Sequence, residues 1–94
     1  MTAEEVAIAA VVRGRVQGVG FRVATRRAAQ ALGVSGWVAN APDGTVHVFA
    51  QGDPEAVDEF VVFLSEGPPA ATVMGVEAVD KPPRPRLLGF EISR

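Results

Sequence analysis

Apolar and polar positions alternate with periods that change along the chain. Residues 6–12 form a nearly continuous apolar run, which is typical of a strand inside a sheet. Apolar residues three or four positions apart then predict a helix over residues 21–32, on the stripe Phe21, Ala24, Ala28 and Leu32. Two stretches with a period of two, residues 34–41 and 45–51, predict a hairpin of two strands.

The second half of the chain repeats this order of elements. Residues 53–55 (Asp-Pro-Glu) predict a helix start, because an aspartate cap, a proline in the first turn and an acid near the positive end of the helix dipole all favour one. The apolar stripe of this helix continues to Leu64, and residues 67–69 (Gly-Pro-Pro) end it. Residues 71–79 predict another strand, and a short last strand follows at Leu88, Phe90 and Ile92.

The order of elements indicates an α+β protein with the ferredoxin-like split βαβ arrangement, βαββαβ plus a short C-terminal strand. We expect a mainly antiparallel sheet with two helices on one face, built by residues 1–94 as a single domain in which residues 1–5 are frayed. A helical crossover joins the first two strands, so both run the same way and end at the same edge of the sheet. With one strand between them, these two ends lie about 10 Å apart.

A glycine-rich segment, GRVQGVGFR at residues 14–22, joins the first strand to the first helix. Its glycines allow positive φ and let several N–H groups turn toward one point, while the helix start adds unpaired N–H groups and a partial positive charge. Arg22 stands in the first helical turn, where its planar fork suits a phosphate. We predict a phosphate cradle made of Arg22 and the N–H groups of Arg15, Val16, Gln17, Gly18, Val19 and Gly20.

The alternative interpretation of this segment is a tight connection that binds nothing. A dinucleotide fingerprint would need glycine at the position of Val23, and a P-loop would need a Gly-Lys pair that the chain lacks. The ligand that we expect is therefore a small phosphate compound and not a nucleotide.

Asn40 ends the second strand, at the edge of the sheet where the cradle is predicted. A phosphate and a water molecule fit between the cradle and this side chain, although a polar residue is also typical of a strand that ends before a turn. Residues 42–44 (Pro-Asp-Gly) form that turn, which makes Asp43 a turn residue and not a catalytic acid. His47 has no carboxylate or cysteine partner nearby in the sequence, so we interpret it as a surface or packing residue.

The composition of the chain limits the partners and the kinds of site that it can have. The formal net charge of −2 argues against a nucleic-acid partner. The chain has no cysteine and a single histidine, which excludes disulfides, thiolate metal sites, cysteine nucleophiles and a histidine cluster for zinc. Apolar runs stay well below the roughly 18 residues that cross a membrane, and we expect a soluble, cytoplasmic monomer. Residues 81–86 hold three prolines and three cations, which favours a stiff surface loop over a polyproline ligand or a nucleic-acid patch.

Two segments together resemble the signature segments of the acylphosphatases. The first is residues 14–22, the second is GWVAN at residues 36–40, and the similarity extends over residues 6–92. The resemblance implies hydrolysis, without metal or cofactor, of the carboxyl-phosphate bond of small acyl phosphates to a carboxylate and inorganic phosphate. It also implies that Arg22 is the catalytic arginine and that Asn40 is the catalytic asparagine, which orients the attacking water. Inorganic phosphate is then both a product and an inhibitor that occupies the cradle.

Two other functions fit the same topology. A ferredoxin-like module without catalytic activity would bind a phosphorylated metabolite or partner through the cradle. An RNA-binding protein of the RRM type would need aromatic residues on its central strands and a basic sheet face, whereas residues 6–12 contain no aromatic residue. Turnover of an acyl phosphate distinguishes the enzyme from both.

Overall fold

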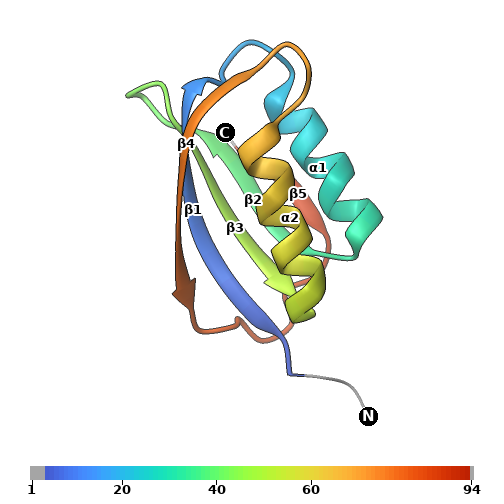
Figure 1. The fold of residues 1–94 in the computed structure, drawn as a ribbon. Helices are drawn as coiled ribbons and strands as arrows, with labels where there is room; N and C mark the ends of the chain where they lie inside the picture. Colours follow the sequence, from blue (N-terminus) through green and yellow to red (C-terminus); the bar gives the residue numbers. More distant parts are fainter. Residues whose placement is uncertain (1–3, 94) are drawn as a thin grey trace.

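A computed structural model describes residues 4–93 of the chain as one sheet with helices packed against it. The two helices lie side by side on the same face of the sheet (Figure 1). In chain order, the elements are β1 (Val6–Arg15), α1 (Phe21–Leu32), β2 (Ser35–Asn40), β3 (Val46–Gly52), α2 (Pro54–Glu66), β4 (Thr72–Lys81) and β5 (Phe90–Ser93). None of the helices in this part of the chain is long and apolar enough to cross a membrane.

The strand order in the sheet is β4-β1-β3-β2-β5. β3 pairs antiparallel with both β1 and β2, so these two strands run the same way on either side of it. β4 is antiparallel to β1, and β5 is parallel to β2. The ferredoxin-like α+β fold that the order of elements predicted is therefore confirmed, and β3 is the strand expected between the first two.

The register of the three inner strands decides which side chains share a face. Val46 of β3 is paired with Val12 of β1 on one side and with Asn40 of β2 on the other. Directly paired residues point to the same face of a sheet. Val12 and Val46 are fully buried in the core under the helices, so the side chain of Asn40 also lies on the helix-covered face, in the last row of the sheet.

The core fills the space between this face and the two helices. Phe60 of α2 is fully buried and meets Phe90 of β5 edge-on, with ring centroids 5.6 Å apart. Phe21, the first residue of α1, is also buried, and its ring lies 6.4 Å from that of Phe63 between centroids. These aromatic contacts fix both helices on the sheet, and with them the position at which α1 begins.

The buried line of α1 differs from the predicted stripe. Its buried residues are Phe21, Thr25 and Ala29, whereas Ala28 and Leu32 are partly buried beside them. The predicted apolar stripe did not include Thr25, because threonine carries a polar hydroxyl group. The spacing of four residues nevertheless keeps Thr25 on the face that meets the sheet, and its side chain has no exposed surface.

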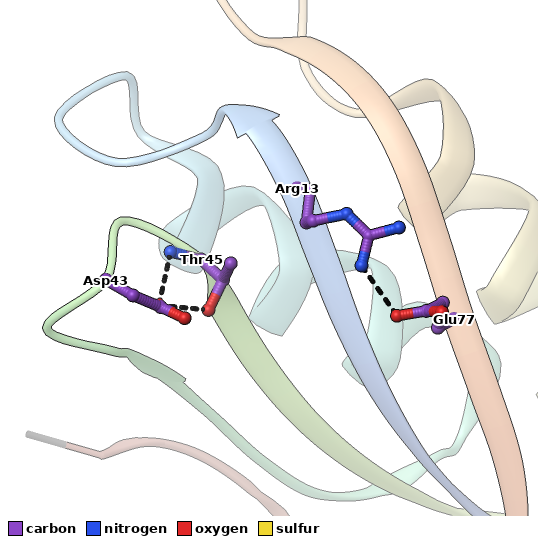
Figure 2. A network of polar contacts seen from close by, with 4 residues as sticks. All are labelled: Arg13, Asp43, Thr45 and Glu77. Atoms are coloured by element: carbon purple, nitrogen blue, oxygen red, sulfur yellow. Dashed lines mark hydrogen bonds and ion pairs between the residues drawn. The ribbon is translucent and has the colours of Figure 1, made fainter.

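β1 extends further than the apolar run predicted. It continues through Arg13 and Gly14 to Arg15, paired with β4, and a register shift between Arg13 and Gly14 alters the pairing near its end. Nη1 of Arg13 lies 2.6 Å from Oε1 of Glu77 across this pair of strands (Figure 2). Because both side chains are exposed, the ion pair adds no more than about 1 kcal/mol to the free energy of unfolding. The loop to α1 thus begins at Val16, and Arg15 belongs to the strand.

Smaller differences concern the ends of other elements. Asp53 precedes α2 as expected, but its side chain makes no capping hydrogen bond. Leu88 lies outside β5 and is 85% exposed. Of the segment expected to be frayed, residues 1–3 lie outside the described residues, whereas Glu5 accepts a hydrogen bond of 3.2 Å from Nε2 of Gln51.

No helix of the described residues covers the other face of the sheet (Figure 1). Phe49 of β3 points to this face but is 3% exposed, because the guanidinium carbon of Arg84 lies 4.7 Å from the centroid of its ring. Gln51 binds the backbone of Arg84. The Arg84 N–H donates to Oε1 of Gln51 at 2.7 Å, and Nε2 of Gln51 donates to the Arg84 carbonyl at 2.9 Å. The exposed loop between β4 and β5, predicted at residues 81–86, is thereby tied to the sheet at the end away from the β1–α1 loop.

Truncation of Phe60 tests this packing. Phe60→Ala removes a fully buried ring and its contact with Phe90, so the free energy of unfolding should fall by about 3–5 kcal/mol. Val62→Ala is the control on the same helix, because Val62 is 55% exposed, and its effect should stay within about 0.5 kcal/mol. Urea unfolding followed by circular dichroism measures both. Equal losses in the two variants would contradict the assigned orientation of α2.

Candidate active site

The candidate site begins with the loop of residues 16–20 between β1 and α1. Gly18 and Gly20 have φ of 74° and 77°, in the left-handed region that glycine adopts at least cost. A Cβ atom at either position would meet nothing within 4 Å, so the requirement for glycine is conformational and not steric. Val16 is buried and Val19 packs on the core, and these two side chains anchor the loop while its backbone stays at the surface.

The backbone N–H groups of this loop are available to a ligand. The first hydrogen bond of α1 runs from Ala24 N–H to the carbonyl of Gly20 at 3.1 Å. Within residues 4–93, the N–H groups of residues 16–20 donate no hydrogen bond. α1 also has neither a side-chain cap nor an acidic residue in its first turn. The positive end of its dipole and the loop N–H groups together favour an anion.

The two predicted arginines differ in their positions. Arg22 is half-buried in the first turn of α1, directly after the loop, and no carboxylate of the described residues forms an ion pair with it. Its planar fork remains available for two hydrogen bonds to a phosphoryl group. Arg15 is exposed at the end of β1, in register with Thr72 of β4. The structure therefore places Val16, Gln17, Gly18, Val19 and Gly20 in the loop, and Arg15 beside it.

Asn40 supplies a polar group on the buried side of the same sheet edge. Its Oδ1 atom is buried and has no hydrogen-bond partner among the described residues. A buried acceptor left without a donor costs about 1–3 kcal/mol, so this atom favours a donor from outside the protein, such as a water O–H. Oγ1 of Thr25 is the other buried side-chain oxygen without a partner in this part of the chain.

The turn after Asn40 has a hydrogen-bonded structure of its own. Ala41 N–H donates to the carbonyl of Thr45 at 2.9 Å, and Gly44 N–H donates to the carbonyl of Ala41 at 3.1 Å. Oδ1 of Asp43 accepts the hydroxyl of Thr45 at 2.6 Å and its N–H at 3.0 Å (Figure 2). As predicted, Asp43 is thus a turn residue. The Thr45 hydroxyl, and then the Thr45 N–H, lower the pKa of the Asp43 carboxyl because both bonds stabilise its ionised form.

His47 lies one position beyond Val46 in β3, so its side chain points to the sheet face opposite to that of Asn40. It is exposed there, as expected for a surface residue. No cluster of three or more histidine, aspartate or glutamate residues that could hold a metal ion occurs within residues 4–93. The chemical groups at the candidate site are therefore N–H groups, one guanidinium and side-chain amides.

Sequence reasoning missed one side chain of this site. It assigned Gln17 a role through its backbone N–H, but the structure shows the side chain engaged as well. Nε2 of Gln17 donates to the carbonyls of Ala41 and Thr45, at 2.8 and 2.9 Å. Figure 2 shows the loop after β1 beside the turn that carries Asp43 and Thr45. The acceptors are 24 and 28 residues away along the chain, so no local pattern could have predicted them.

Comparison with known proteins agrees with this fold and identifies its family. The family model described as acylphosphatase matches residues 8–92. An acylphosphatase of Rubrobacter xylanophilus is 53% identical over 86% of this chain and 74% of its own length, and one of Acaryochloris marina is 45% identical over 95% of each chain. The crystal structure of acylphosphatase from Bacillus subtilis has a TM-score of 0.91 at 31% identity, covering 95% of this chain and 99% of the other.

These similarities define a hydrolase of the ferredoxin-like class, and the chain belongs to the acylphosphatase family. The predicted activity, hydrolysis of the carboxyl-phosphate bond of acyl phosphates, is confirmed at the level of the family and the enzyme class. Acyl phosphate is accordingly the substrate, and inorganic phosphate is a product.

The pKa of Asp43 provides a test of the turn beside the site. Asp43 accepts its two bonds in the ionised form, so they stabilise the fold above the ordinary value near 3.8 and are lost as the pH falls through the lower folded-state pKa. A carbon NMR titration of the carboxyl should give a midpoint below 3.8. Thr45→Val removes the hydroxyl and should move the midpoint back up. A midpoint that is identical with and without this hydroxyl would contradict the assigned cause.

Proposed function

We propose that residues 16–20 and Arg22 bind the phosphoryl group of an acyl phosphate and that Asn40 orients the attacking water. The observation that carries this proposal is the position of the buried, unpartnered Oδ1 of Asn40. Asn40 is in register with Val46 and Val12, so its side chain lies on the helix-covered face of the sheet. This row of residues is near the end of β1 that leads into the loop. An acceptor for a water proton and a set of donors for phosphoryl oxygens thus lie at one edge of the sheet.

An acyl phosphate demands little acid-base assistance, because its leaving group is a carboxylate. The water oxygen forms a bond to phosphorus, the bond from phosphorus to the carboxyl oxygen breaks, and the carboxylate leaves with the electron pair. Positioning and stabilisation of charge then account for most of the catalysis. Arg22 offers only hydrogen-bond donors, and the side chains of Gln17 and Asn40 are amides, so none of the three is a base for the water proton. We therefore assign the water proton to a phosphoryl oxygen of the substrate, which becomes inorganic phosphate.

The cradle and Arg22 hold the negative charge of the phosphoryl oxygens. N–H groups fixed in a loop need no reorientation when the charge shifts during transfer, which is the basis of electrostatic preorganisation. Arg22 adds a formal charge and two parallel donors. Inorganic phosphate offers the same oxygens, so it should compete with the substrate for this site.

The competing functions have less support. A binding module without activity leaves the match to the acylphosphatase family over residues 8–92 unexplained. For nucleic acid, the ring of Phe49 on the open face is covered by Arg84, which leaves the half-buried Trp37 as the one accessible aromatic residue of the three inner strands. The proposed site uses residues of a single chain, so we also propose that the enzyme works as a monomer, which light scattering tests. We also propose that the enzyme is located in the cytoplasm, which cell fractionation tests.

Substitutions at Arg22 and Asn40 should have different kinetic effects. Arg22→Ala should raise KM and the inhibition constant of phosphate as well as lower kcat, because a charged, bidentate contact to the phosphoryl group is lost. Arg22→Lys should restore these values only in part. Asn40→Ala should lower kcat by about 10²-fold while phosphate inhibition stays nearly unchanged. The assay is acetyl phosphate hydrolysis, with and without phosphate.

Arg27→Ala is the matched control for Arg22, since it removes the same charge from an exposed position of the same helix. Its kcat, KM and phosphate inhibition should equal those of the unchanged enzyme. A folded Asn40→Ala enzyme with full activity would remove Asn40 from the mechanism.

Chelation tests the donor set of the proposed site. Its groups are N–H donors, a guanidinium and amides, and no carboxylate or histidine that a divalent cation would prefer stands among them. Hydrolysis of acetyl phosphate should therefore continue at an unchanged rate after exhaustive dialysis against EDTA. Activity that disappears in EDTA and returns with Mg²⁺ would show that a metal takes part in the reaction.

A further inference from the structure

The side chain of Gln17 connects the β1–α1 loop to the turn after Asn40. Its Nε2 atom donates to the carbonyl of Ala41, the residue after Asn40, and to the carbonyl of Thr45, the residue before Val46. Since Asn40 and Val46 are paired, these two acceptors are the first carbonyls beyond that pair on β2 and β3. Gln17 thus binds the turn immediately next to Asn40.

We propose that Gln17 is a positioning residue, which holds the phosphate cradle at a fixed distance from Asn40. This inference rests on the function proposed above for the cradle and for Asn40. Gln17 acts through these two groups and need not touch the water itself. Its effect is on the geometry between a phosphoryl group bound at the loop and a water held by the Asn40 amide.

The loop needs such a connection because little else restrains its backbone. Its N–H groups donate no hydrogen bond within residues 4–93, and two of its five residues are glycines. Val16 and Val19 anchor the loop to the core, but apolar contacts are not directional. The bonds from Gln17 are the side-chain hydrogen bonds that join this loop to another element in the described chain. These two hydrogen bonds therefore fix the orientation of the loop backbone, which apolar packing alone does not fix.

The amide of glutamine suits this role chemically. Nε2 carries two hydrogens, one for each carbonyl, whereas an ionised glutamate has no donor and would repel both oxygens. The connection also matters kinetically, because a displacement of about 1 Å between reacting groups can cost on the order of 10²-fold in rate. A loosened cradle would still bind phosphate through its N–H groups and Arg22, but it would present the phosphoryl group to Asn40 less often in a productive arrangement.

Gln17→Met tests the inference, because methionine keeps the length of the side chain and removes both donors. We expect kcat for acetyl phosphate to fall by at least about 10-fold, with the inhibition constant of inorganic phosphate within about threefold of the unchanged enzyme. Gln51→Met is the matched control. Gln51 also makes two hydrogen bonds to one backbone segment, that of Arg84, at the other end of β3. Gln51→Met should lower the midpoint of thermal unfolding and leave kcat unchanged.

The double variant with Asn40→Ala decides whether Gln17 acts through Asn40. If it does, Gln17→Met should lower kcat of the Asn40→Ala enzyme by less than about twofold, because the group that it positions is already absent. Fully multiplicative losses would overturn the inference and leave the role of Asn40 intact. A fully active Asn40→Ala enzyme would instead overturn the proposed function on which the inference rests.

Gln17→Glu gives an independent readout that does not depend on the methionine variant being folded. An ionised carboxylate beside two carbonyls repels them, whereas the protonated form can donate to one. Its kcat relative to that of the unchanged enzyme should therefore rise as the pH falls from 8 to 5, and the control Gln51→Glu should show no such rise. A pH profile of Gln17→Glu parallel to that of the unchanged enzyme would overturn the inference.

Discussion

The pairing of Val46 with Val12 on one side and with Asn40 on the other is the constraint on which the site depends. Side chains alternate along a strand, so a shift of one residue between β2 and β3 would turn Asn40 to the open face of the sheet. Burial of Val38, two residues before Asn40 on β2, excludes such a shift energetically, because its apolar side chain would be exposed together with Asn40. The packing of the core thus determines the face of the sheet to which the Asn40 side chain points.

The chemistry proposed for this edge uses hydrogen-bond donors, one positive charge and one buried acceptor, and no general acid or base. Backbone N–H groups and Arg22 provide donors and positive charge, and Asn40 provides a buried acceptor. Such a set suits a substrate whose leaving group is already a good one, since rate then depends on geometry and on fixed electrostatics. The residues that surround these groups matter for the same reason. In a site without a strong acid or base, the rate depends on the relative positions of the groups.

Two glutamines fasten irregular segments at opposite ends of β3. Gln51 binds the backbone of Arg84 in the loop between β4 and β5, and Gln17 binds the turn between β2 and β3. The two contacts resemble each other in geometry, yet they differ in what they hold. The first closes the end of the sheet away from the site and contributes to stability. The second lies between the proposed phosphate cradle and Asn40, the two groups whose relative position we propose that it fixes.

The sequence by itself determined the elements, their order and the turn at Asp43, because periodicity and turn residues are local signals. It also predicted the cradle from its glycine spacing, and the roles of Arg22 and Asn40 from the resemblance to a known family. Only the tertiary structure decided that Thr25 faces the core, that the Asn40 oxygen is buried without a partner and that Gln17 reaches the next turn. The acceptors of Gln17 are backbone carbonyls, which every residue carries, so no side-chain pattern marks them. Which carbonyls meet this amide depends on how two loops approach once the sheet has formed.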